Sequence, residues 1–244
     1  MSQIYVSPEQ EVVEQKQSKS GVLSFAKVFL FMFMFLAITT AVSFGVGGLI
    51  TLALYNGADP EILANVYYGL MIGSAIALFV MMIVVNFVVL RGRHSVLIPA
   101  IIYSVLMGVL LSSFTILIDW RLLGTAFGIT CGVFLLMTLI AVLSKGNLHP
   151  LLMVGIGLMI GAGVLALVNW LIQSDVIMWI VSFVIFAAIM FITMFDIWNI
   201  KNICARGQMN NNISMYCAFT LYVDFINILI RVIIFLLAAS GRRS

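Results

Sequence analysis

Long apolar runs recur along the chain and limit what it can fold into. Seven runs are each long enough to cross about 30 Å of hydrocarbon, which takes roughly 20 helical residues. They cover residues 28–55, 64–90, 96–118, 122–143, 151–172, 176–200 and 213–239. Of the 244 residues, 64% are hydrophobic and 9% are charged, which excludes an ordinary soluble domain. The sequence therefore predicts an all-α integral membrane protein with seven transmembrane helices.

The segments outside these runs are short and polar. Residues 1–20 carry both acidic and basic side chains, and we predict a disordered cytoplasmic tail there. The connections between the runs are too short to hold a soluble domain. We therefore predict a single seven-helix membrane domain over residues 21–241.

Basic residues gather in alternate connections, which predicts the orientation of the chain. By the positive-inside bias, the N-terminus and the even-numbered loops are cytoplasmic. These segments hold Lys16, Lys19, Lys27, Arg91, Arg93, Lys145, Lys201 and Arg206. Seven crossings then leave Arg242 and Arg243 outside, so either this terminus is an exception to the bias or the last run crosses incompletely. We expect the exception, in a cell membrane, with an endoplasmic reticulum or other internal membrane as the alternative.

Most familiar sequence signatures of chemistry are missing. Gly155, Gly157, Gly161 and Gly163 look loosely like a phosphate-binding loop, but they lie inside an apolar run with no strand before them. Small residues four apart, such as Gly157 and Gly161, are more typical of close packing between membrane helices. The net charge of +3 is too scattered to indicate nucleic acid as a partner. We expect no enzyme and no cofactor.

The remaining candidates are ionisable groups at membrane depth, namely Asp196, Asp224 and Arg231. A charge in hydrocarbon costs roughly 2.5 to 3.5 kcal/mol even on an insertion scale, so such residues usually face a bundle interior. Steps of three and four place Asp224, Asn227 and Arg231 on one helical face, and Asp196 and Asn199 on another. We expect these stripes to be hidden from lipid.

Two carboxylates that meet in a bundle of low dielectric constant cannot easily both ionise, so Asp196 and Asp224 would titrate as a unit. Ionised, their oxygens suit a hard cation such as Ca²⁺, held weakly and transiently. The structural alternative is that Asp224 and Arg231 pair or find separate polar partners. Depth also matters, because Asp196 lies close to the end of its run and Asp224 lies further from the start of its own. Contact between them would need tilt or a later start to the last helix.

The last two runs resemble the Bax inhibitor-1 family, also called the transmembrane Bax inhibitor motif proteins. LYVDFINIL at residues 221–229 is similar to a signature of that family, and FAAIMFITMFD, which ends at Asp196, is similar to a second one. Weaker likenesses are GVLLSS at residues 108–113 and VLALVNWLI at residues 164–172. The resemblance implies six helices in two groups of three around a central seventh.

The same resemblance implies a pH-sensitive calcium leak channel in which Asp196 and Asp224 are the pH-sensing pair on the ion pathway. It also implies a basic latch near the end of the second helix, either Arg91 or Arg93, of which Arg91 is preferred because it is deeper. Calcium would be the permeant ion and the lipid bilayer a partner. The alternative is a membrane interaction protein that regulates a membrane protease or a stress or cell-death pathway through the polar connector at residues 201–212. An intramembrane hydrolase ranks lower, because no glycine-rich motif adjoins either aspartate.

Overall fold

The computed structural model describes residues 8–91 and 95–241, and all seven of the expected helices are found there. The helices are α1 (Pro8–Tyr55), α2 (Pro60–Arg91), α3 (Leu97–Leu117), α4 (Trp120–Leu143), α5 (His149–Ile172), α6 (Asp175–Ala205) and α7 (Asn211–Gly241). Each is long and apolar enough to cross a membrane. The predicted fold class is confirmed.

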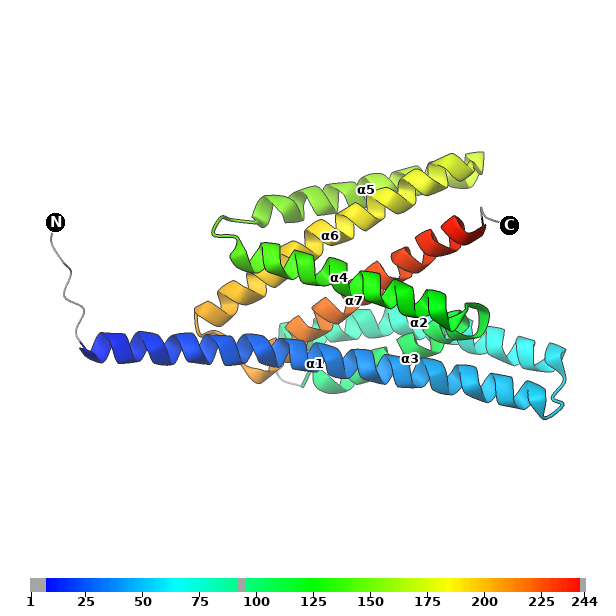
Figure 1. Cartoon of the computed structure of the whole chain (residues 1–244), viewed down its shortest axis with the longest axis horizontal. Coiled ribbons are helices and arrows are strands. Elements are labelled where there is room, and N and C mark those ends of the chain that lie inside the picture. Colours follow the sequence, from blue (N-terminus) through cyan, green and yellow to red (C-terminus); the bar gives the residue numbers. More distant parts are fainter. Residues whose placement is uncertain (1–7, 92–94, 242–244) are drawn as a thin grey trace.

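Helix α7 forms the centre of two groups of three helices (Figure 1). In the first group α3 packs between α1 and α2, and in the second α6 packs between α4 and α5. Half of the most apolar stretch of α7 is buried, against at most a third in any other helix. Its contacts are mainly with α1, α4 and α6. Residues in the apolar stretch of α7 are therefore buried more often than those in the other helices.

Polar contacts fasten the helices at one end of the bundle, which we call the Lys201 end. Lys201 Nζ donates to the carbonyl oxygens of Val142 at 2.6 Å and Ser144 at 3.1 Å, so a cation caps the C-terminus of α4. Lys27 Nζ of α1 donates to Asn211 Oδ1 at the start of α7, at 2.7 Å. At the opposite, Tyr55 end, Phe235 of α7 stacks on Phe183 of α6, with ring centroids 4.8 Å apart.

Two expectations from the sequence differ from the structure. Helix α1 begins at Pro8, so residues 8–20 are helical, whereas a disordered tail was expected there. Proline is favoured in the first turn of a helix, and the glutamate, glutamine and lysine residues that follow are good helix formers. Residues 1–7 of that tail lie outside the described part of the chain.

The second difference concerns the glycines of α5. A Cβ atom added to Gly157 or Gly161 would meet nothing within 4 Å, so neither residue packs a helix closely within this chain. Gly155 does, because a Cβ there would lie 2.7 Å from Ile192 Cγ1 and 3.1 Å from the Ala188 carbonyl oxygen of α6. The glycine pattern therefore identified a helix that packs closely, but the contact is made by Gly155 and not by Gly157 or Gly161.

Candidate functional site

Asp196 and Asp224 meet between α6 and α7. Asp224 is 8% exposed, and its carboxyl group lies close enough to that of the half-buried Asp196 for the two to interact. Asp196 lies nine residues before the end of α6 at Ala205, and Asp224 lies thirteen after the start of α7 at Asn211. The remaining offset is about 6 Å along the axes. It is smaller than the sequence predicted because α6 continues five residues beyond Ile200.

A hydrogen bond between the two carboxyl groups would require a proton. A carboxylate only accepts hydrogen bonds, so one member of the pair has to be protonated to donate to the other. The Oδ2 atom of Asp224 is buried and has no donor directed at it from any described residue. No lysine or arginine of the described chain forms an ion pair with either carboxylate. No positively charged side chain of the described residues therefore compensates this pair of carboxyl groups.

Thr193 of α6 is the other polar neighbour of Asp224. It is fully buried and lies close enough to that aspartate to interact with its carboxyl group. Its hydroxyl also donates to the Ile189 carbonyl oxygen at 2.8 Å, one helical turn back. Since a threonine has one hydroxyl hydrogen, Asp224 and the carbonyl compete for it. The surrounding side chains therefore supply too few hydrogen-bond donors for the carboxyl oxygens of Asp224.

A polar strip leads from the aspartates toward the Lys201 end, and the sequence analysis missed it. Tyr216 lies near enough to Asp196 to interact with its charge, and its hydroxyl donates to Asn86 Oδ1 of α2 at 3.2 Å. Thr220 lies one turn from Tyr216 and one turn from Asp224 on the same face of α7. The four-residue spacing of tyrosine, threonine and aspartate was the signal that could have found this strip.

The expected asparagine partners do not belong to the buried site. Asn227 and Asn199 are both exposed, although each shares a helical face with its neighbouring aspartate. Among the described residues neither has an assigned hydrogen bond. The prediction that they are hidden from lipid was wrong because each lies about 60° around its helix from the aspartate, beyond the edge of the α6 and α7 contact.

Arg231 is half-buried and forms no ion pair with Asp224. The two residues are seven positions apart on α7, about 10 Å along the axis, which is too far for direct contact. Arg93 lies outside the described residues, and so does the side chain of Arg91, which ends α2. The described α2 side chain that reaches α7 beside the aspartates is Asn86.

The opposite face of α7 carries a second polar group whose hydrogen bonds are complete. The Tyr222 hydroxyl lies 2.6 Å from Thr39 Oγ1 of α1, and that threonine donates to the Ser104 carbonyl oxygen of α3 at 3.0 Å. Because Thr39 uses its hydrogen on Ser104, Tyr222 is the donor in the shorter contact. This chain of hydrogen bonds ties α7 to the first helix group.

No group of three or more histidine, cysteine, aspartate or glutamate side chains is placed to hold a metal ion in the part of the chain that the structure describes. Two carboxylates supply four oxygens, whereas Ca²⁺ takes six to eight ligands. The pair by itself therefore supplies too few oxygens to hold Ca²⁺.

The fold and this site define a multi-pass helical membrane protein with a buried carboxyl pair on its central helix. Residues 22–242 match the family model described as inhibitor of apoptosis-promoting Bax1, so the chain belongs to the Bax inhibitor-1 family. It is 31% identical over 132 residues to the inner membrane protein YbhL of Escherichia coli K12, and equally to that of an O6:H1 strain. That alignment covers 52% of this chain and 56% of the relative, so the chain spans about half the length of the curated relatives it matches.

Proposed function

We propose that this protein is a pH-sensitive cation leak, with Ca²⁺ as its permeant ion, in which the protonation state of Asp196 and Asp224 shifts a closed and open equilibrium. The observation that carries the proposal is the buried Oδ2 atom of Asp224, which lacks a donor, in a residue that lies beside a second carboxyl group. A buried polar atom without a partner is rare in a native protein and calls for an explanation. A shared proton or a passing cation satisfies it, and the two exclude each other.

The accessible face of α7 supports a path for the ion. Beyond Asp224 toward the Tyr55 end, the half-buried Arg231 lies on the same face of α7. Toward the Lys201 end, Tyr216 and Thr220 continue the polar strip. The positive charge of Arg231 is an electrostatic barrier to cations on this path, which suits a slow leak better than a fast channel.

The location and orientation of the protein are part of the same proposal. The lysines of the Lys201 end favour a cytoplasmic position for that end and for the N-terminus. The relatives named above are inner membrane proteins, which favours a bacterial cell membrane.

Flux into liposomes tests the function directly. Wild type, Asp196→Asn and Asp224→Asn are reconstituted with a calcium dye inside, and flux is measured from pH 5 to 8. We expect a pH-dependent flux in the wild type that either substitution flattens, and its slope tells which form of the pair conducts. Asp175→Asn, an exposed carboxylate at the start of α6, is the matched control and should behave as wild type. Absence of flux above empty liposomes, with folded protein, would contradict the proposal.

The alternative function, regulation of a membrane protease or a stress pathway, depends on the connector between α6 and α7. That connector is shorter than the sequence indicated, because residues 201–205 belong to α6 and residues 211–212 to α7. Arg206, Gln208 and Asn210 are exposed and form the available surface. A partner that crosslinks to wild type and Asp224→Asn, and that is lost when residues 206–210 are changed, would favour this alternative.

A further inference from the structure

A pocket of about 400 Å³ lies on the side of α7 away from Asp224, near the Tyr55 end. Its floor is formed by Ile226, Leu229 and Ile233, and its walls come from α1 and α3 on one side and α4 on the other. Helices α1 and α4 are not packed against each other, so the pocket opens between them. Phe44 and Phe127 at this opening are 56% and 45% exposed. In a membrane the opening faces the bilayer.

The polar atoms on the wall are largely committed to the protein. The hydroxyls of Thr39 and Thr40 donate to the carbonyl oxygens of Ser104 and Leu36. The single hydroxyl hydrogen of Thr115 is shared between the carbonyl oxygens of Ser112 at 2.8 Å and Ser43 at 3.2 Å. Most of the other lining residues are apolar. An apolar cavity holds water poorly, so its occupant is apolar as well.

The size of the pocket decides whether an acyl chain or a helix can occupy it. A helix about 10 Å across has a cross-section of about 80 Å², so this volume would hold only about one turn of it. The pocket runs along the first eight residues of α4, from Trp120 to Phe127. That is about 10 Å, within the roughly 15 Å of one leaflet. A single hydrocarbon chain fits these dimensions, whereas a helix of a second protein does not.

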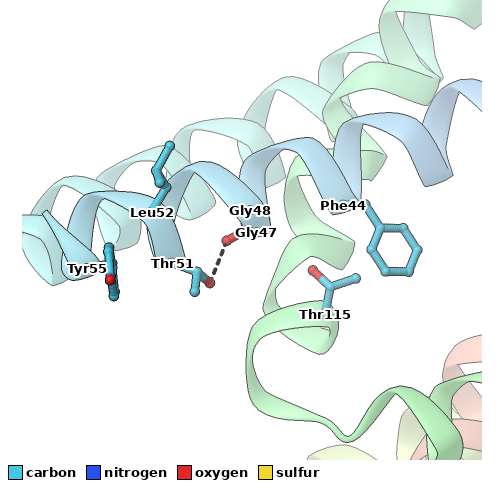
Figure 2. A pocket seen from close by; sticks show the side chains of 7 residues that line it. All are labelled: Phe44, Gly47, Gly48, Thr51, Leu52, Tyr55 and Thr115. Atoms are coloured by element: carbon cyan, nitrogen blue, oxygen red, sulfur yellow. Dashed lines mark hydrogen bonds between the residues drawn. The ribbon is translucent and has the colours of Figure 1, made fainter.

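A second pocket, of about 500 Å³, continues the first along α1. It shares Phe44 and Thr115 with the first, and it extends past Gly47 and Thr51 to Tyr55. Figure 2 shows Phe44 of α1 and Thr115 of α3 at the junction, with Thr51 turned back to bond the Gly47 carbonyl oxygen. The two pockets together form a track that runs along α1 toward Tyr55.

Opposite charges stand at the mouth of the first pocket. Trp120 lines the pocket and is 74% exposed, as expected for a tryptophan at a membrane interface. Its neighbours Asp119 and Arg121 are both exposed, and the Arg121 guanidinium lies 5.8 Å from the Trp120 ring centroid. A guanidinium matches a phosphate, and a carboxylate matches an ammonium group.

From these features we propose that the pocket between α1, α3, α4 and α7 binds one acyl chain of a zwitterionic glycerophospholipid, such as phosphatidylethanolamine. The phosphate lies at Arg121 and the ammonium group at Asp119. The site is separate from the aspartate pair, since neither aspartate lines it. It is a lipid site of the leaflet at the Tyr55 end.

Gly124 makes the proposal testable because it lines the pocket and a Cβ added to it would meet nothing within 4 Å. Gly124→Phe therefore fills the space that the chain would occupy. Gly128→Phe is the matched control, since Gly128 lies one turn along α4, is equally open and does not line the pocket. The intermediate variant Gly124→Leu is used if the phenylalanine variant does not fold, as judged by gel filtration.

The probe is phosphatidylethanolamine with a photoreactive diazirine at the end of one acyl chain, in vesicles containing the full-length protein. We expect crosslinked peptides from the pocket walls of α1 and α4, with a yield at least fivefold lower in Gly124→Phe and unchanged in Gly128→Phe. Unlabelled phosphatidylethanolamine should compete better than phosphatidylglycerol. Crosslinks spread evenly over lipid-facing helices such as α5, or equal in both variants, would overturn the acyl-chain site. Equal competition by both lipids would overturn the assignment of the headgroup.

Discussion

Helix α7 carries two buried polar groups only two residues apart, and their surroundings differ in kind. Tyr222, on the face toward α1 and α3, donates to Thr39, which donates in turn to a carbonyl oxygen. Asp224, on the face toward α6, has an oxygen with no donor and a second carboxyl group beside it. A satisfied buried network fixes one arrangement of helices, whereas an incomplete one leaves a choice of occupants. The first face of α7 is therefore structural, and the second is where a switch can operate.

The largest expected effect concerns the stability of the Asp224 face as pH rises. When the pair loses its shared proton in the folded wild type, two neighbouring buried carboxylates repel each other. Unfolding separates them. Wild-type stability should therefore be greatest while the proton is held and should fall by about 3 kcal/mol once it is lost.

Asp224→Asn removes this dependence, because an amide can donate to the Asp196 carboxylate without titrating. Unfolding is followed by tryptophan fluorescence in acidic and in alkaline buffer. The free energy of unfolding should be the same in both buffers for the variant and lower in alkaline buffer for wild type. If both proteins lost the same stability on raising the pH, the pair would not be the titrating group.

Breaking the satisfied face should cost somewhat less. Thr39→Val keeps the shape of the side chain but leaves the Tyr222 hydroxyl buried without its acceptor, which we expect to cost about 2 kcal/mol. The loss should be the same at every pH, unlike the effect at Asp224. A pH-dependent loss would show that the two faces are coupled.

Tyr222→Phe sharpens the same comparison. It removes the donor itself, and Thr39 can still donate to the Ser104 carbonyl oxygen, so no buried group is left without a partner. The expected cost is about 1 kcal/mol, smaller than that of Thr39→Val. Thermal unfolding of the two variants side by side compares their losses of stability. A larger loss in Tyr222→Phe than in Thr39→Val would mean that the donors and acceptors in this chain of hydrogen bonds are not the ones given above.

Asn227→Leu should have the smallest effect. The side chain is exposed and has no assigned hydrogen bond in the described structure. We therefore expect a change within about 0.5 kcal/mol, measured by the same unfolding assay. A loss of stability as large as that expected for Thr39→Val would instead indicate that Asn227 belongs to the buried site.

Hydropathy was sufficient to predict the seven helices, because the length of each apolar run is set by the bilayer. It could not predict where polar helix ends stop, so α6 was expected to end at Ile200 and reaches Ala205. That difference of more than one turn decides whether Asp196 can reach Asp224. Charge identified both aspartates because a carboxylate in an apolar run is conspicuous.

Side-chain facing was harder to predict than depth. Asn227 and Asp224 share a helical face by spacing, yet the edge of α6 falls between them. Tyr222 and Thr39 escaped notice because tyrosine and threonine are ordinary in apolar runs, and their partnership joins residues 183 positions apart. The lipid pocket likewise depends on the gap between α1 and α4, which no local pattern encodes.

Infrared difference spectroscopy would test most directly whether one proton is shared between Asp196 and Asp224. Protein in lipid is titrated while the carbonyl stretch of protonated carboxyl groups is recorded, for wild type, Asp196→Asn, Asp224→Asn and the Asp175→Asn control. We predict a titrating band in wild type and in the control that shifts or disappears in each of the two pair variants. A band that persists unchanged in both, or no titrating band in wild type, would contradict a proton shared by these two residues.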